Sequence, residues 1–352
     1  MINRRDLLKI GALASASAII PFNSLFSKTK PFSNPIKTIK PPRLKIGDTI
    51  GLAVPGSSIN EEELKDSIIN MEKLGFKVFH TDRILKKTGF LGGTDQERAA
   101  DLNELFANKK IKAIICARGG YGCNRLAELI DYNIVKANPK IICGYSDITT
   151  LLYQLYSQTG LVCFHGPVAT STFNEFSVNN FMNTLVEPKD TFTMKSADED
   201  KDKPDYKRLV INPGTAEGVL AGGNLSLVVG QIGTKYDVCL DNKILFIEEV
   251  GEEPYRIDRM LTQLLQADKL KNVAGIAMGV FSGCEEKKHD PEYKDAFTLR
   301  EVLKERLGNL KVPIIYGLSF GHITNKFTLP FGIKARLDTD NESITLLEKA
   351  VE

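Results

Sequence analysis

The chain has 352 residues, of which 42% are hydrophobic and 26% charged, as in a soluble globular protein long enough for two domains. The formal net charge of +2 excludes the broad basic surface that nucleic-acid binding needs. The six cysteines show neither a CxxC motif nor a zinc-like spacing with histidine, so we expect mostly free thiols in the core and no metal site.

The first 27 residues resemble an export signal. Arg4 and Arg5 form a twin-arginine pair, and no charged residue occurs from Ile10 to Ser27. This pattern predicts export to the periplasm by the twin-arginine route. The alternative is an uncleaved anchor in the inner membrane, but weak hydrophobicity and Pro21 favour a signal. No stable membrane insertion is expected after its cleavage.

Residues 28–44 read as a flexible leader, and strands then alternate with helices through residues 45–195. The apolar runs predict strands at residues 49–54, 76–80, 111–116 and 140–143. The helical periodicity predicts helices at residues 61–74, 95–107, 126–130 and 150–156. Such alternation predicts an α/β fold, here an N-terminal domain with a doubly wound, mostly parallel sheet.

A charged segment, residues 196–207, interrupts the periodicity and reads as a linker. Beyond it, residues 208–348 predict a smaller, mixed α/β domain at the C-terminus, rich in β-structure and with a smaller sheet. Its expected strands are residues 243–247, 273–281, 313–316 and 327–330, and its expected helices are residues 255–265 and 299–307.

Ser146 lies between a predicted strand and a predicted helix, in the run Gly144-Tyr145-Ser146-Asp147. A serine on such a tight turn can be an exposed nucleophile beside backbone amides that stabilise an oxyanion. Serine is also a common N-cap of helices. The run alone favours the cap, and the rest of the chain has to decide between the two.

A glycine-rich loop, Arg118-Gly119-Gly120-Tyr121-Gly122, follows the strand predicted at residues 111–116. Glycines let a backbone approach a ligand closely, although the lysine and hydroxyl residue of a phosphate loop are absent. Because ligands bind beyond the carboxyl ends of parallel strands, we expect the loops at Pro55, Arg118 and Ser146 to share one crevice.

Two further candidates lie in the second half. Glu248 and Glu249 end a predicted strand, where a carboxylate can orient a histidine. His322 follows another strand within Gly321-His322, but His165 also follows a strand. The residues alone leave both histidines open as a general base, whereas His289 lies in a charged surface run.

Seven segments, in order, resemble the LD-carboxypeptidase family over residues 45–345. They are Ala53-Val54-Pro55-Gly56-Ser57, Arg118-Gly119-Gly120-Tyr121-Gly122, Gly144-Tyr145-Ser146-Asp147, His165-Gly166-Pro167, Gly222-Gly223-Asn224-Leu225, Ile247-Glu248-Glu249 running to Pro254-Tyr255-Arg256, and Phe320-Gly321-His322. The resemblance implies a catalytic triad of Ser146, Glu248 and His322, with Glu249 the less favoured acid. It also implies an oxyanion hole from the backbone amides of Asp147 and Gly120. Arg118 and Asn224 are its candidate substrate-binding residues, although each could instead hold loop structure.

The resemblance further implies a serine carboxypeptidase without a cofactor, commonly a homodimer. Such enzymes remove the terminal D-alanine from murein tetrapeptides through an acyl-enzyme, in cell-wall recycling. One alternative is an immunity-type peptidase that cleaves a peptidyl-nucleotide antibiotic. Another is a non-catalytic periplasmic protein that binds muropeptides. The export signal points to periplasmic peptidoglycan as the substrate.

Overall fold

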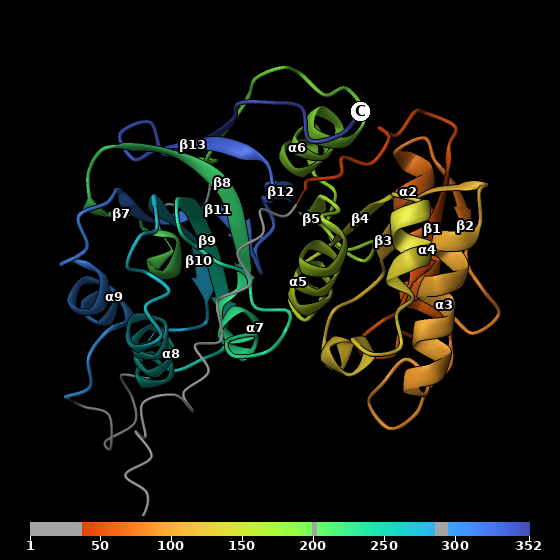
Figure 1. Ribbon diagram of the computed structural model, residues 1–352, viewed down its shortest axis with the longest axis horizontal. Helices are drawn as coiled ribbons and strands as arrows, with labels where there is room; N and C mark the ends of the chain where they lie inside the picture. The colour runs from red at the N-terminus through yellow and green to blue at the C-terminus, as the bar shows by residue number, and fades with distance from the viewer. Residues whose placement is uncertain (1–36, 199–202, 286–294) are drawn as a thin grey trace, which may run out of the picture. The chain divides into compact units, whose positions relative to one another are not determined.

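The computed structural model describes residues 37–198, 203–285 and 295–352, and Ile36–Glu352 forms one compact unit. The predicted export signal lies outside the described residues. Within the described ranges, no helix has both the length and the apolar character needed to cross a membrane. The unit contains two β-sheets with helices packed against them (Figure 1).

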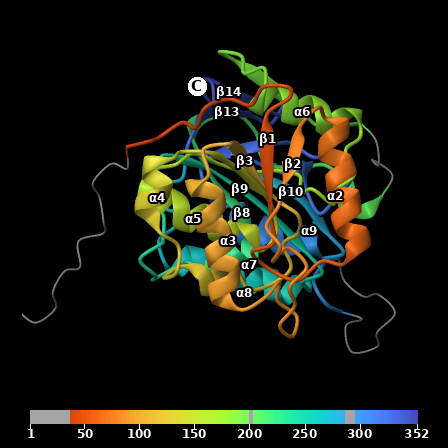
Figure 2. The same ribbon diagram turned by 90° about the vertical axis from the view of Figure 1, so that its right-hand side faces the viewer.

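The first sheet has six strands in the order β12-β5-β4-β3-β1-β2, and only β12 is antiparallel to its neighbour. Its strands are β1 (Thr49–Ala53), β2 (Lys77–Phe79), β3 (Ile111–Cys116), β4 (Ile141–Gly144), β5 (Cys163–His165) and β12 (Leu329–Phe331). The helices that follow these strands in the chain are α2 (Glu61–Lys73), α3 (Asp95–Ala107), α4 (Tyr132–Ala137), α5 (Ile148–Thr159) and α6 (Glu175–Leu185). Figure 2 shows α2 on one side of β1 and α3, α4 and α5 on the other. This doubly wound arrangement confirms the predicted fold class.

The second sheet has eight strands in the order β6-β14-β13-β8-β9-β10-β11-β7, with a parallel centre from β8 to β11. Its strands are β6 (Phe192–Lys195), β7 (Leu209–Asn212), β8 (Thr215–Asn224), β9 (Lys243–Val250), β10 (Gly275–Ser282), β11 (Ile314–Gly321), β13 (Lys334–Asp338) and β14 (Ser343–Leu346). The accompanying helices are α7 (Leu225–Gly230), α8 (Pro254–Gln266) and α9 (Leu299–Leu307).

The expectation that the second sheet is the smaller one is wrong, since it has eight strands against six. The outer strands β13 and β14 are short, and β13 carries exposed charges such as Lys334 and Arg336. Buried and exposed residues alternate along β13, and β14 has only four residues, so no apolar run marks either strand in the sequence.

The helix expected at residues 126–130 is also wrong. A short 3₁₀ turn, Cys123–Leu126, occurs there, and α4 begins only at Tyr132. The carboxylate of Asp131 accepts hydrogen bonds from the amides of Asn133 and Ile134, which fixes the start of α4. The predicted bounds of α3 and α9 agree with the structure, and capping boxes begin both helices.

The chain exchanges strands between the two sheets. β6 precedes the predicted linker but lies in the second sheet, whereas β12 comes from the second half of the chain and lies in the first. α5 lies between the sheets and contacts β8 and α7 (Figure 1). One cluster of buried apolar residues includes members of both sheets. All six cysteines are free, as predicted, and five of them are buried.

Candidate active site

Ser146 has a backbone conformation that is unusual for an L-amino acid. It lies between β4 and α5 with φ of +65°, in the left-handed region. This region costs a non-glycine residue about 1–2 kcal/mol. Asp147, not Ser146, occupies the N-cap position of α5, and its side chain makes no capping hydrogen bond. The interpretation of Ser146 as a helix cap is therefore wrong, and the strained strand-to-helix turn is of the kind that carries nucleophiles.

The glycine-rich loop after β3 packs directly against the Ser146 turn. A Cβ atom added to Gly119 would lie 3.0 Å from the Cβ of Ser146 and 3.3 Å from the amide nitrogen of Asp147. A larger residue at this position would push these neighbours away by a few tenths of an ångström. The Cys123 amide donates to Oδ2 of Asp147 at 2.8 Å, and the Ser57 amide donates to the carbonyl of Gly119 at 2.9 Å. The loops after β1, β3 and β4 thus meet at one edge of the first sheet.

Glu248 and His322 form a hydrogen-bonded pair in the second sheet. Nδ1 of His322 lies 2.7 Å from Oε2 of Glu248, whose side chain is completely buried. A carboxylate at Nδ1 favours the tautomer with its proton on that nitrogen, which leaves Nε2 free to accept a proton. Oε1 of Glu248 has no hydrogen-bond partner within the described ranges.

Glu249 points to the opposite face of β9, because successive side chains of a strand alternate. Its carboxylate accepts four hydrogen bonds of 2.7–2.9 Å. The donors are Nδ2 of Asn224, the amide and the hydroxyl of Ser226, and the amide of Val250. Burial raises the pKa of Glu249 above its ordinary value, while these hydrogen bonds oppose the shift. Glu249 therefore ties β9 to the start of α7, and Glu248 alone reaches His322.

His165, the other histidine left open by the sequence, has no carboxylate partner. Its ring is buried beside Tyr145, Phe246 and Phe320, and neither ring nitrogen has a hydrogen-bond partner within the residues described. Burial lowers its pKa to about 4. A neutral, enclosed imidazole is poorly suited to shuttle a proton, so the geometry favours His322 as the base.

Tyr145 connects the serine turn with the histidine. Its ring centroid lies 4.8 Å from that of His322, in an edge-to-face arrangement. Tyr145 immediately precedes Ser146, and His322 immediately follows β11. The structure therefore brings the end of β4 and the ends of β9 and β11 to one place, although they lie in different sheets.

The two candidate substrate-binding residues both make contacts within the protein. Arg118 is about half exposed and pairs with Oε1 of Glu63 at 3.0 Å. Asn224 is buried: its side chain donates to Glu249, and its amide donates to Oγ1 of Thr149 at 3.0 Å. The Oδ1 atom of Asn224 also accepts the Leu227 amide as the N-cap of α7. These contacts fix the two side chains within the protein. That either of them binds substrate stays a prediction.

The structure adds one residue that no motif in the sequence indicates. Lys326 is buried, and its ammonium lies 5.4 Å from the centroid of the Tyr145 ring. Burial lowers the pKa of Lys326 to about 8, while the charge of Glu248 opposes the shift. A lysine next to Asn325 in a polar stretch looks like a surface residue in the sequence, so no local signal could have found it.

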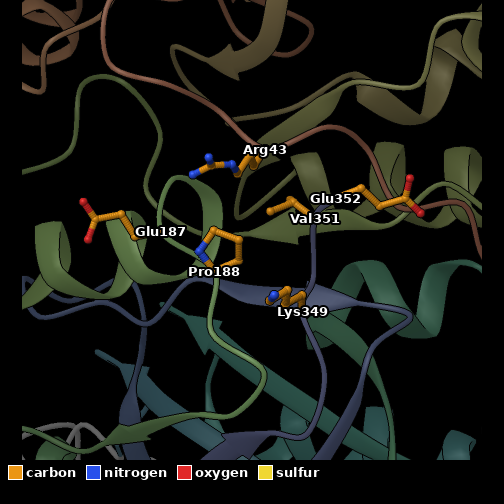
Figure 3. A pocket seen from close by; sticks show the side chains of 6 residues that line it. All are labelled: Arg43, Glu187, Pro188, Lys349, Val351 and Glu352. Atoms are coloured by element: carbon orange, nitrogen blue, oxygen red, sulfur yellow. The ribbon is translucent and has the colours of Figure 1, made fainter.

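A separate pocket of about 410 Å³ lies near the C-terminus (Figure 3). None of the predicted site residues lines this pocket. Its lining combines basic, acidic and apolar residues, namely Arg43, Glu187, Pro188, Lys349, Val351 and Glu352. No group of three or more His, Cys, Asp or Glu side chains arranged to hold a metal ion occurs in the described part of the chain.

Two family models match the chain, the LD-carboxypeptidase N-terminal domain over residues 50–166 and the LD-carboxypeptidase C-terminal domain over residues 217–337. The chain therefore belongs to the LD-carboxypeptidase family of peptidases, as its motifs predicted.

Two relatives and two solved structures illustrate this membership. The "Probable murein peptide carboxypeptidase" of Bacillus subtilis is 36% identical over 87% of this chain and 94% of its own length. The microcin C7 self-immunity protein MccF of Escherichia coli is 30% identical over 87% of this chain and 95% of its own length. The structure of MccF in the apo state has a TM-score of 0.79 at 27% identity, covering 89% of this chain and all of that one. The muramoyltetrapeptide carboxypeptidase of Oxalobacter formigenes has a TM-score of 0.72 at 29% identity, covering 85% of this chain and 97% of that one.

Proposed function

We propose that this protein is a serine LD-carboxypeptidase that removes the terminal D-alanine from murein tetrapeptides. The observation that carries the proposal is the hydrogen bond between the buried Glu248 and the partly exposed His322, beside Tyr145, which precedes a serine on a strained strand-to-helix turn. The names of the relatives from Bacillus subtilis and Oxalobacter formigenes support a murein peptide as the substrate.

In the proposed mechanism Ser146 attacks the carbonyl carbon of the scissile amide. Nε2 of His322 accepts the hydroxyl proton, while Glu248 fixes the ring through Nδ1 and stabilises the imidazolium. The amides of Asp147 and Gly120 donate to the oxyanion of the tetrahedral intermediate, and loss of one such donor typically costs on the order of 10²-fold in rate.

The imidazolium then gives its proton to the departing amine of D-alanine, which leaves an ester between Ser146 and the remaining tripeptide. A water molecule, deprotonated by His322, attacks this ester and regenerates the serine. The left-handed turn suits this role, because Ser146 lies between β4 and α5 and Asp147, not Ser146, is the N-cap of the helix.

The test is the release of free D-alanine from a disaccharide tetrapeptide by the purified protein. We expect loss of one alanine mass from the substrate, and no release by Ser146→Ala. A folded Ser146→Ala protein that retains the wild-type rate would contradict the role of Ser146. A protein that binds the tetrapeptide but never cleaves it between pH 5 and 9 would instead be the non-catalytic alternative.

A second candidate function is that of an immunity-type peptidase, favoured by the likeness to MccF. It would use the same serine on an amide of a peptidyl nucleotide. A side-by-side assay separates the two, with a murein tetrapeptide and a peptidyl-sulfamoyl adenosine at equal concentrations. We expect the larger kcat/KM for the tetrapeptide.

We further propose that residues 1–27 direct export to the periplasm and that the mature protein is a homodimer. The twin-arginine pair supports the first part, and family resemblance supports the second. Fusing residues 1–27 to a reporter that is active only after twin-arginine export tests the first part. Light scattering of the purified protein tests the second.

A further inference from the structure

Lys326 carries a buried cation that contacts the Tyr145 ring but pairs with no anion among the described residues. Its side chain is only 6% exposed, and its ammonium makes no hydrogen bond or ion pair with any residue that the structure describes. A buried charge is costly unless an opposite charge or hydrogen-bond acceptors compensate it. The site thus holds a positive charge that lacks an anion.

The charge lies next to the proposed catalytic residues. The ammonium is 5.4 Å from the centroid of the Tyr145 ring, and the same ring is 4.8 Å from that of His322. The acid whose charge acts on the ammonium is Glu248, but Oε2 of Glu248 is engaged by His322. Among the described residues, no hydrogen bond or ion pair joins Glu248 directly to the ammonium.

The backbone around Lys326 is fixed in place. Lys326 lies in the segment that links β11 of the second sheet with β12 of the first. Its amide donates to Oγ of Ser177 at 3.0 Å, and that hydroxyl donates to the carbonyl of Thr324 at 3.1 Å. The next amide, of Phe327, donates to the carbonyl of Ser319 at 2.8 Å. A cation held this way loses little conformational entropy when an anion binds.

We propose that Lys326 binds the terminal carboxylate of the substrate and so makes the enzyme a carboxypeptidase. The inference rests on the proposed function. The other basic candidate, Arg118, is half exposed and already paired with Glu63. A carboxylate gains more from an unpaired, buried ammonium than from a solvated, paired guanidinium.

The experiment compares two murein tetrapeptides, one ending in D-alanine and one ending in D-alaninamide, which lacks the negative charge. Kinetics are measured for the wild type, for Lys326→Met and for Lys326→Arg. The control is Lys334→Met, which removes the same charge from an exposed lysine on β13 that pairs with Glu217 on β8.

For Lys326→Met we expect kcat/KM on the free acid to fall about 10- to 100-fold, the usual size of a charged hydrogen bond. Turnover of the amide should change little, which also shows that the variant is folded. Lys326→Arg should restore part of the preference for the acid, and Lys334→Met should behave as the wild type.

Two outcomes count against the inference, and they can be told apart. An active Lys326→Met enzyme that keeps the wild-type preference for the acid over the amide would overturn the role of Lys326 alone. A wild-type protein that cleaves neither tetrapeptide would overturn the proposed function, and the inference with it.

Discussion

At the residue scale, Ser146 shows how a site can oppose local stability. A serine with φ of +65° is less stable than a glycine would be at that position, and glycine cannot act as a nucleophile. Nearby, the buried Glu248 has one oxygen on His322 and one without a partner among the described residues. Both features lower the stability of the folded protein, and a catalytic role of Ser146 and Glu248 would explain them.

The strain at Ser146 predicts a difference between two inactive variants. Ser146→Gly should have a free energy of unfolding about 0.5–1 kcal/mol higher than Ser146→Ala, because glycine tolerates the left-handed region but loses more backbone entropy. Urea denaturation of both variants measures the difference. If Ser146→Ala is the more stable of the two, the turn does not hold this conformation in solution.

The two neighbouring glutamates should respond differently to the same change. Glu248→Gln removes the charge that orients His322, and we expect kcat to fall about 10²- to 10⁴-fold, as is typical for the acid of a triad. Glu249→Gln should chiefly lower the free energy of unfolding, since Glu249 accepts hydrogen bonds from Asn224 and Ser226. Steady-state kinetics with urea denaturation of both variants checks this, and the opposite pattern would exchange the two roles.

His165 should make the protein sensitive to acid. Its pKa is lowered to about 4 in the folded protein, so between pH 6.5 and 4 the unfolded chain binds the extra proton. The contribution of the neutral ring to stability is present above pH 6.5 and is lost as the pH falls toward 4. His165→Leu should therefore reduce the loss of unfolding free energy from pH 6.5 to 4.5 by about 2 kcal/mol.

Urea denaturation at both pH values measures this effect. His80→Leu, at a half-buried position outside the seven family segments, is the control. An equal acid sensitivity of wild type and His165→Leu would mean that His165 is protonated or hydrated in solution.

At the element scale, the contact of α5 with β8 decides whether the two halves of the site meet. Thr149, in the first turn of α5, accepts the amide of Asn224 at the end of β8. Gly223 packs so closely on Thr149 that a Cβ atom would lie 2.4 Å from its Cγ2. The turn that carries Ser146 is thereby held against the sheet that carries Glu248.

Gly223→Ala should separate these elements. The added methyl group collides with Thr149 at a φ of +142°, and such overpacking typically costs about 1–3 kcal/mol of stability. We expect kcat/KM to fall as well, since small displacements of catalytic groups are costly. Gly230→Ala is the matched control, because no atom lies within 4 Å of its Cβ position. Equal effects of the two substitutions on D-alanine release and unfolding would contradict this account.

The buried strands could be predicted from the sequence because they are continuous apolar runs. Ile111–Cys116 and the helix Asp95–Ala107 agree residue for residue with the structure. The strands β13 and β14 could not, since exposed and buried side chains alternate along β13 and β14 has only four residues. In the site, motifs indicated Ser146, Glu248 and His322. The position of Lys326 near them could not be predicted, because it depends on the pairing of β12 with the first sheet.

At the scale of the whole molecule, strand exchange should make folding cooperative. The first half of the chain supplies β6 to the second sheet, and the second half supplies β12 to the first. A single cluster of buried apolar residues includes members of both sheets. Cutting the chain at the predicted linker therefore removes an edge strand from each sheet.

Fragments 37–195 and 208–352, expressed separately, should each fail to fold. The first would leave the edge of β5 unpaired and β6 without its sheet, and exposed edges favour aggregation. The intact protein should unfold in urea in one transition by fluorescence and by circular dichroism. A fragment that unfolds cooperatively on its own would show that the halves are independent.

The most direct test of the central claim is the rate at which the purified protein releases D-alanine from a murein tetrapeptide, with and without Ser146. We predict measurable release by the wild type, and for Ser146→Ala a fall in kcat of about 10⁴-fold or more, as for other serine nucleophiles. Release by Ser146→Ala within tenfold of the wild type would contradict the proposed mechanism.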